Sequence, residues 1–427
     1  MLRNKALIIS AILLAGILSA NAQSSTNSPY TRYGLGDISS QAFTSNAAMG
    51  GIGYGLRNHY HINTMNPASY TSVDSLSFMF DMGFSLKSSN YKENGIKSNA
   101  KNSAFDYMAM QFRLHKRLGM VIGFTPFSNV GYNFSQQTKI KSENGESNLE
   151  KDTYFTNTFY GDGGLQQIFG GLGFKITKNL SFGANFGYLY GDINYSTTGT
   201  PSNGGDYRVE YNNIDIKTYK LDLGMQYTLP LKKDNITFGI TYGFGHDVNS
   251  QETKGDQITN GIDYEETQED IVKDAYAIPH TIGAGIVWEH NNKIKLGFDY
   301  SLQKWEGIKY DNQTNRYNNR NRIAAGMEYT PNHMGRKYLS RVFYRIGTSY
   351  QNSYLKLPDG NDGPDEFSVS AGFGFPLNKY QRNSVLSITG EYTRVKPSVK
   401  DMLSENRFMI KLGLTFNERW FMKWRVN

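Results

Sequence analysis

Apolar and polar residues alternate along the chain in segment after segment of about ten residues. In the clearest segment, 407–416, every second residue is apolar: Phe408, Ile410, Leu412, Leu414 and Phe416. The same period of two recurs in the segments 180–190, 236–244, 294–300 and 367–375. Because successive side chains of a β-strand point to opposite faces, the pattern predicts strands with one apolar face and one polar or glycine-rich face.

The connections between these segments alternate in length. Short connections are expected near 115–117, 177–179, 231–235, 291–293, 331–339 and 379–383. Long connections are expected near 88–104, 141–152, 196–210, 249–275, 303–320, 351–366 and 396–404. Thirteen alternating connections predict fourteen antiparallel strands with every tight turn at one end, the arrangement of outer-membrane β-barrels. A soluble β-sandwich shows the same alternation of side chains, but it has no reason to sort its connections by length.

The beginning of the chain predicts export. Arg3 and Lys5 precede an apolar stretch that ends at Ala20-Asn21-Ala22, a sequence typical of a cleaved signal peptide over residues 1–22. The alternative, a membrane anchor, requires a longer apolar segment. No later stretch of the 427 residues approaches the ~20 apolar residues of a spanning helix. The absence of cysteine excludes disulfides, thiolate metal sites, cysteine nucleophiles and a lipid-modified N-terminal cysteine.

The charge balance changes little after export. Without Arg3 and Lys5 the chain has 43 basic and 38 acidic residues, a net charge of +5 (45 − 2 − 38). This excess is too small to indicate a nucleic-acid partner.

Many inward-facing positions of the predicted barrel (75–427) carry charge, and both signs occur. They are Asp81, Lys87, Arg113, Lys220, Asp222, Lys295, Asp299, Arg322, Glu328, Arg341, Arg345, Glu391, Arg407 and Lys411. Isolated charges in a dry interior cost several kcal/mol, so the mixture predicts ion pairs to the wall or to a plug, or a water-filled lumen. Contact with a substrate is the alternative role for these charges.

Residues 23–74 have no sustained period and form a candidate plug. The segment includes Arg32 and Asp37, a glycine cluster that contains Gly51, and the sequence Asn66-Pro67-Ala68. A fourteen-stranded barrel is too wide for its side chains to fill, so a compact segment inside it is a sensible use of this stretch.

The chain resembles the FadL/TodX-type outer-membrane proteins. The resemblance rests on Ala47-Ala48-Met49-Gly50-Gly51, on Asn66-Pro67-Ala68 and on the strand count; the stretches 28–37 and 417–421 also look like uncharacterised members from Bacteroidota. It implies a location in the cell outer membrane and passive uptake of hydrophobic or amphipathic small molecules, such as long-chain fatty acids, past a plug and through a lateral opening at a kinked third strand. Pro126 and Gly131 are candidates for that kink; a strand that leaves the membrane and bends there is the alternative.

No pattern indicates an enzyme or a cofactor. The seven histidines form no H-E-x-x-H motif, G-x-S-x-G is absent, and the acidic stretch 249–275 matches no EF-hand loop. We expect the acidic stretch to be a solvated loop; it could also bridge cations at the lipopolysaccharide surface or contact a partner. Two functions therefore remain: the uptake channel, and a sealed docking subunit of an outer-membrane secretion or assembly complex. The expected partners are outer-membrane lipid and lipopolysaccharide, a hydrophobic small molecule, and the protein partners of such a complex.

Overall fold

The computed structural model describes residues 25–75, 77–139, 154–202, 204–259, 264–377, 384–399 and 402–419. The predicted signal peptide lies outside these ranges. Trp420, Phe421 and Trp424, which the sequence predicts to form an interfacial aromatic girdle after the last strand, also lie outside them. Within them, no helix has the length and apolar character needed to cross a membrane.

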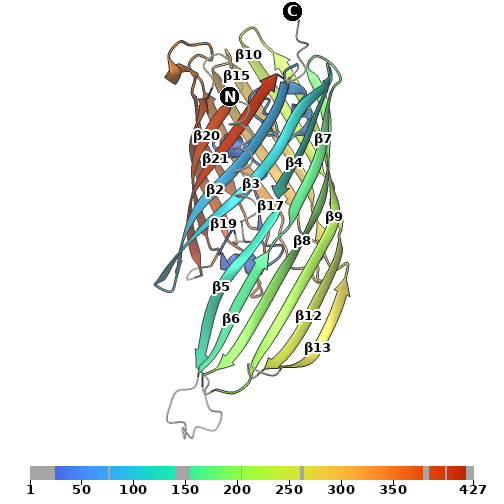
Figure 1. Cartoon of the computed structure of the whole chain (residues 1–427), viewed down its shortest axis with the longest axis vertical. Helices are drawn as coiled ribbons and strands as arrows, with labels where there is room; N and C mark the ends of the chain where they lie inside the picture. The colour runs from blue at the N-terminus through green and yellow to red at the C-terminus, as the bar shows by residue number, and fades with distance from the viewer. Residues whose placement is uncertain are drawn as a thin grey trace, which may run out of the picture.

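The chain forms a closed antiparallel β-barrel (Figure 1). Its wall contains β2 (Ser77–Glu93), β3 (Ile96–His115), β4 (Leu118–Pro126), β5 (Ser128–Lys139), β6 (Tyr154–Gly163), β7 (Gln166–Lys175), β8 (Leu180–Pro201), β9 (Tyr207–Pro230), β10 (Asp234–Gly243), β15 (His280–His290), β16 (Ile294–Lys304), β17 (Arg320–Tyr329), β18 (Phe343–Gln351), β19 (Asp365–Pro376), β20 (Val385–Lys396) and β21 (Ser404–Arg419). β4 continues into β5 and β6 into β7, so the wall has 14 strands, and β21 closes it by pairing with β2. The predicted strand number is confirmed.

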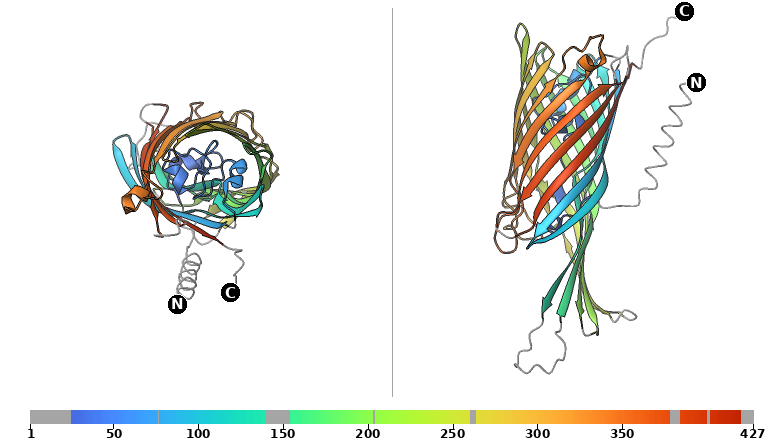
Figure 2. Two further views of the ribbon diagram at one scale, coloured as in Figure 1. Left: turned by 90° about the horizontal axis from the view of Figure 1, so that it is seen from above. Right: turned by 90° about the vertical axis from the view of Figure 1, so that its left-hand side faces the viewer.

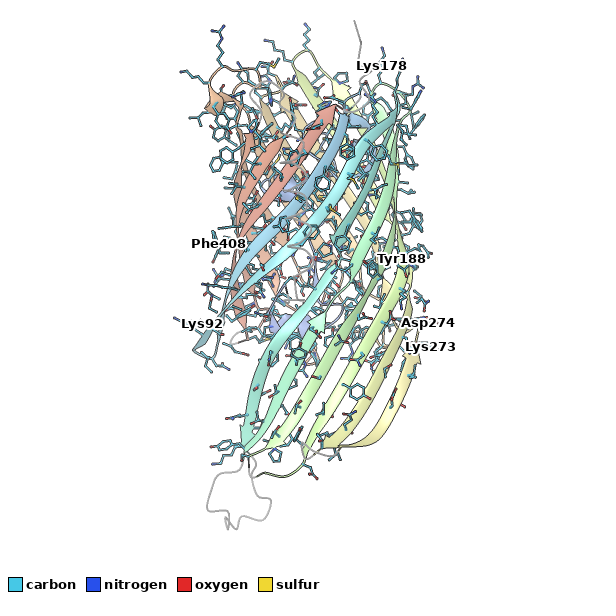
Figure 3. All side chains as sticks on the ribbon, in the orientation of Figure 1. Lys92, Lys178, Tyr188, Lys273, Asp274 and Phe408 are labelled. Atoms are coloured by element: carbon cyan, nitrogen blue, oxygen red, sulfur yellow. The ribbon has the colours of Figure 1, made fainter. Side chains whose placement is uncertain are left out.

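The alternating pattern places apolar side chains on the outside of the wall. Phe182, Phe238 and Leu412 are 41%, 46% and 41% exposed, whereas polar neighbours of opposite parity such as Gln226 and Thr389 are fully buried. Figure 3 shows side chains over the outside of the barrel, including the labelled Tyr188 and Phe408. An outward apolar band on a closed wall without open edges is the arrangement that a bilayer requires, which identifies a transmembrane β-barrel.

One side of the barrel extends into a tall sheet, which we call the outer sheet. It consists of β5, β6, the outer parts of β8 and β9, and the hairpin of β12 (Asn249–Thr259) and β13 (Tyr264–Lys273), paired in the order β5-β6-β8-β9-β12-β13. In Figures 1 and 2 this sheet projects well beyond the opposite wall. A short pair, β11 (His246–Asp247) and β14 (Ala277–Ile278), lies at its base.

Three of the predicted long loops are therefore wrong. The stretch 88–104 is a continuous hairpin of β2 and β3, most of 196–210 belongs to β8 and β9, and 249–275 is largely β12 and β13. These strand ends lie outside the apolar band, where water instead of lipid meets the outward face and also reaches part of the inward face. Their sequences therefore lack the apolar alternation by which strands were recognised.

The N-terminal segment, residues 25–75, lies inside the barrel (Figure 2, left). It contains η1 (Pro29–Arg32), β1 (Asp37–Ile38), α2 (Thr44–Ala47) and η2 (Pro67–Ser72). The third 3-10 helix, η3 (Tyr338–Arg341), lies in the turn before β18. The largest buried apolar cluster lies at the base of the outer sheet, where Leu35 of the N-terminal segment packs with wall and loop residues such as Ile193, Tyr276, Trp305 and Tyr354.

Candidate functional site

The predicted Asn66-Pro67-Ala68 sequence begins η2 and joins the N-terminal segment to the wall. The Asn66 side chain caps the helix by accepting from the Ala68 amide at 3.1 Å, and its Nδ2 donates to the carbonyl groups of Tyr54 at 2.8 Å and Met225 at 3.2 Å. Pro67, at the first helical position, lies against Gly183 of β8, and a Cβ atom there would overlap its backbone. One capping residue thus orders both the segment and its contact with β8 and β9.

Glycines on several strands allow the backbone of the N-terminal segment to touch the wall directly. A Cβ atom on Gly119 (β4), Gly239 (β10) or Gly326 (β17) would overlap the carbonyl group of Tyr70, Tyr54 or Met49, respectively. Further backbone contacts of this kind involve Gly173, Gly183 and Gly347, whereas Gly224 and Gly413 face side-chain atoms of the segment. The sequence pattern predicted a polar or glycine-rich face on the strands, but sequence reasoning missed the role of these glycines. The sequence signal for this role was the recurrence of glycine at strand positions that face the lumen.

The predicted glycine cluster is held between two wall side chains. Arg322 of β17 donates to the carbonyl oxygens of Gly51 and Gly50, at 3.3 and 2.5 Å. Asp299 of β16 accepts from the amides of Gly53 and Tyr54, at 2.6 and 3.0 Å. Gly51 has φ +72°, and a Cβ atom on it would meet the Arg322 guanidinium at 2.5 Å, so a glycine is required at this position.

A buried histidine connects the segment to an ionic group on the wall. His61 bridges Oγ1 of Thr415 (3.0 Å) and Nη2 of Arg345 (2.9 Å). Arg345 also forms a 2.7 Å ion pair with Glu328, whose second oxygen lies 3.3 Å from Lys295. Burial, followed by the nearby Arg345 charge, lowers the pKa of His61 well below its usual value. The imidazole of His61 is therefore neutral, and the charged groups around it are paired with one another.

The other predicted lumen charges occupy different levels of the barrel. Glu391 and Lys411 form a 2.8 Å ion pair, and the buried Asp81 accepts from the Tyr107 hydroxyl at 3.1 Å. Arg113 donates to the Val73 carbonyl at 3.3 Å, near the end of the N-terminal segment. Arg341 lies in η3 instead of a strand, with its guanidinium 5.4 Å from the Tyr338 ring, because the turn before β18 is longer than expected.

Arg32 and Asp37, the first two predicted plug residues, contact the wall near the outer rim. The Arg32 guanidinium lies 3.9 Å from the Phe159 ring centroid, and Asp37 lies 3.5 Å from Arg407. Arg407 is also paired with Glu366 at 3.1 Å and with the buried Glu405 at 2.8 Å. Most charges around the N-terminal segment thus have partners, as expected for low-dielectric surroundings.

The third strand is interrupted at the candidate kink. β4 ends at Pro126 and β5 begins at Ser128, and beyond this point β5 no longer lies beside β3. Up to the break the wall is intact, because β4 pairs with β3 from Phe124 to Leu118 and with β7 along its whole length. The Phe105 and Phe124 rings, with centroids 6.1 Å apart, lie beside this break. The second candidate, Gly131, lies in β5, where its amide and carbonyl groups contact Thr31 Oγ1 at 3.2 Å.

A cavity of about 1880 Å³ lies between the N-terminal segment and the outer half of the wall. Six basic and seven acidic residues line it: Lys87, Lys220, Arg320, Arg322, Arg407, Lys411, Asp37, Asp106, Asp162, Asp192, Asp222, Glu366 and Glu391. Phe84, Phe105 and Phe124 form an apolar patch beside the interrupted strand, and Phe127 also lines the cavity. The cavity therefore combines charged side chains of both signs with an apolar lining surface.

The part of the chain that the structure describes holds no cluster of three acidic or histidine side chains able to bind a metal ion. His246, the histidine closest to a predicted long loop, hydrogen-bonds Thr218 at 2.8 Å and stacks on Tyr219. His280 bonds the Tyr242 hydroxyl at 2.8 Å.

Comparison with solved structures shows the FadL-like fold. The Pseudomonas putida toluene transporter TodX aligns with a TM-score of 0.60 and 13% identity, over 91% of this chain and 100% of that one. A Pseudomonas aeruginosa FadL homologue aligns with a TM-score of 0.60 and 13% identity, over 89% and 99% of the two chains. The monoaromatic hydrocarbon channel CymD gives 0.59 and 15%, over 91% and 100%.

No curated protein matches the sequence. The sequence does match one protein family along its entire length, from residue 1 to residue 427. On this basis the chain, a FadL-like transmembrane β-barrel with its N-terminal segment in the lumen, belongs to the BamG family.

Proposed function

We propose that this protein is a sealed barrel in the outer membrane that serves as a docking subunit of a secretion or assembly complex. The observation that carries the proposal is the direct contact between the N-terminal segment and wall glycines on opposite sides of the barrel. Gly119, Gly239 and Gly326 lie on β4, β10 and β17, and each is covered by backbone of the segment. Because the segment contacts the wall closely on several sides, it acts as a permanent plug of the lumen.

Buried polar contacts strengthen this seal. Arg57 of the segment donates to Gln226 of β9 at 2.9 Å and to Ser181 of β8 at 3.4 Å, and burial lowers its pKa to about 10. Moving the segment out would break these bonds together with those of His61, Asp299 and Arg322. Each buried group left without its partner costs about 1–3 kcal/mol, and charged groups cost more. Release without an energy source would therefore be rare.

The outer sheet supplies the surface that a docking subunit needs. It projects beyond the apolar band, and β5, β6, β12 and β13 add nothing to the closure of the wall within the band (Figure 1). A strand extension of this length costs conformational entropy and presents open edges, so it indicates a surface used by a partner.

Gentle extraction from the outer membrane followed by native mass spectrometry tests the proposal. We expect the protein to be recovered with partner proteins in fixed stoichiometry, and with no lipid-like mass bound in the lumen. Recovery of the protein alone, or with a bound amphiphile only, would contradict the docking role. The plug is tested separately: deletion of residues 24–70 should raise the permeability of liposomes containing the protein to small solutes, and unchanged permeability would remove the plug hypothesis.

Passive, non-enzymatic passage of hydrophobic or amphipathic small molecules is the second candidate function. The observation that favours it is the apolar patch of Phe84, Phe105 and Phe124 in the cavity, beside the interruption after Pro126. Relatives in fold are named as a toluene transporter and a monoaromatic hydrocarbon channel. A fatty-acid-like ligand would enter where β5 leaves β3. Uptake of such a ligand into liposomes by the intact protein, abolished by Phe105→Glu, would favour this function over a sealed barrel.

A further inference from the structure

The outer sheet ends in two strands that each have only one full-length neighbour. β5 pairs with β6, and β13 pairs with β12. Beyond Ser128 and Asn129, which pair with β1, no described strand pairs with the second edge of β5. An unpaired edge presents a row of amide and carbonyl groups that can accept a further strand, and natural proteins usually protect such edges.

The two edges differ in their protection. β13 carries four acidic residues, Glu265, Glu266, Glu269 and Asp270, and a run of like charges discourages strand pairing. β5 has the sequence SNVGYNFSQQTK, with no proline, no acidic residue and one lysine at its end. The edge of β5 is thus suited to pairing.

The N-terminal segment already uses the beginning of this edge. Asp37 and Ile38 pair with Asn129 and Ser128 in antiparallel register, and the Ser39 amide donates to the Phe127 carbonyl at 2.9 Å. The pairing stops after two residues because Gly36, with φ +83°, turns the chain away. The edge therefore accepts a strand in this structure, but only over its first residues.

Gly131 shows which residues of β5 point their backbone amide and carbonyl groups toward the unpaired edge. Its amide and carbonyl groups both point away from β6, toward Thr31. In an antiparallel strand every second residue points its backbone groups to the same side. Asn133, Ser135 and Gln137 consequently present their backbone groups at the free edge, and all three residues are exposed.

The surroundings of this edge specify the charge of a partner. The outer half of β3, residues 96–104, faces the same opening and also lacks a second strand neighbour. It carries Lys97 and Lys101, both exposed, and neither this part of β3 nor β5 contains an acidic residue. A second copy of this chain would bring these lysines together with their own equivalents, so a homodimer through this edge is disfavoured. An acidic segment is the complementary occupant.

We propose that an extended acidic segment of a partner protein adds to the edge of β5 as a further strand, pairing with Asn133, Ser135 and Gln137. This inference rests on the proposed docking function and locates its contact surface. Backbone hydrogen bonds supply affinity in such strand addition, and side chains on alternate positions supply specificity. On the inner face one partner side chain would pack on Phe134, which is half-buried and lies 5.1 Å from the Phe159 ring centroid.

A matched pair of variants separates backbone pairing from side-chain contact. Asn133→Pro removes the outward amide without removing a β5–β6 hydrogen bond, whereas Asn133→Ala keeps the amide and removes only the side chain. We expect the proline variant to reduce recovery of the partner at least tenfold and the alanine variant to leave it nearly unchanged. Equal effects of the two variants, or no effect of proline, would overturn the inference. A heat-dependent shift in gel mobility checks that both barrels are folded, and Gln137→Pro provides a second test of the same edge.

Crosslinking in intact cells gives an independent readout. A photoreactive side chain at position 133, 135 or 137 should yield one heteromeric adduct, and the same side chain at 196 or 198 of the central strand β8 should not. The amides of these three β5 residues should also exchange hydrogen quickly in the isolated protein and slowly in the complex. An adduct of twice the mass of this chain, adducts of equal yield on β8, or no adduct would overturn the inference. Stoichiometric partners that crosslink elsewhere would reject this edge while leaving the docking function intact.

Discussion

Arg345 on β18 donates to His61 of the N-terminal segment across 2.9 Å, although 284 residues separate the two in the sequence. Because a guanidinium can only donate, Nε2 of His61 must be the acceptor. Nδ1 then carries the proton and donates to Oγ1 of Thr415 at 3.0 Å. The ring is neutral and both nitrogens have partners, so this contact fixes the position of the segment relative to β18 and β21.

Substitution of Arg345 by methionine should loosen the N-terminal segment. Glu328 would keep only Lys295 as a cationic partner, and His61 would lose the donor to Nε2. Removing one partner of a buried ion pair costs about 3–5 kcal/mol. We expect a fall of that size in the free energy of unfolding measured in urea, and faster proteolysis of the segment. Arg208→Met is the matched control: its pair with Asp256 is exposed, and such pairs contribute about 0–1 kcal/mol. Equal losses in both variants would contradict the role of Arg345.

Acidification should weaken the attachment of the segment through His61. Its pKa in the folded protein is lowered, first by burial and then by Arg345, while the unfolded chain has a value of about 6.5. The displaced segment therefore binds a proton that the seated segment does not, so stability is full above about pH 7 and falls as the pH drops through about 6.5. The slope can reach about 1.4 kcal/mol per pH unit.

Proteolysis rates of the segment at pH 7.5 and 5.5 measure this effect. His61→Gln should remove most of the pH dependence, whereas His59→Gln should retain it, because His59 lies on the same segment but is exposed. If the His61→Gln variant keeps the pH dependence of proteolysis, groups other than His61 cause it.

The closed barrel was predictable from the sequence because lipid imposes a strict period of two. Residues such as Phe182 and Phe238 must face hydrocarbon, and their inward neighbours must not, so strand positions follow from the alternation of side chains. The strand number follows from the alternating short and long connections between them. The same reasoning failed above the membrane. There β12 and the outer part of β8 have water on much of both faces, and nothing in the side-chain pattern distinguishes a polar strand from a loop.

The candidate site was predictable in its residue types but not in its partners. The alternation of side chains along the strands identified Glu391, Lys411 and Arg345 as charges that face the lumen. The pairing of Arg345 with His61 depends on the fold of the irregular N-terminal segment, which has no repeating pattern from which its contacts could be predicted. The wall glycines were visible as small residues on the inward face. Their meaning becomes clear only once the carbonyl groups of Tyr54 and Met49 are seen against them.

Adding a methyl group to Gly239 should displace the N-terminal segment. A Cβ atom there would overlap the Tyr54 carbonyl, and overpacking of this kind costs about 1–3 kcal/mol. We expect Gly239→Ala to accelerate proteolysis of the segment and to raise the ion conductance of the protein in planar bilayers. Gly170→Ala is the control, because a Cβ atom at Gly170 of β7 meets nothing within 4 Å. Unchanged proteolysis and conductance in Gly239→Ala would mean that the segment can shift without opening the lumen.

An arginine in the middle of the outward face should destabilise the barrel more than one at the edge of the apolar band. Ile240 is the central member of the five outward side chains of β10 and its extension, 236–244, and is 53% exposed, whereas Phe244 is the last of them. Charged residues facing lipid cost about 2–4 kcal/mol at the bilayer midplane and about 0–1 kcal/mol near its edges. Ile240→Arg should therefore lower the free energy of folding into lipid vesicles, measured by urea titration, by a few kcal/mol more than Phe244→Arg does. Detergent micelles deform around a charge, so the difference in stability between the two variants should be smaller in micelles than in vesicles. Equal losses for the two positions in vesicles would mean that this face does not lie across a bilayer, because depth dependence is the property that distinguishes a membrane-spanning surface from a buried protein interface.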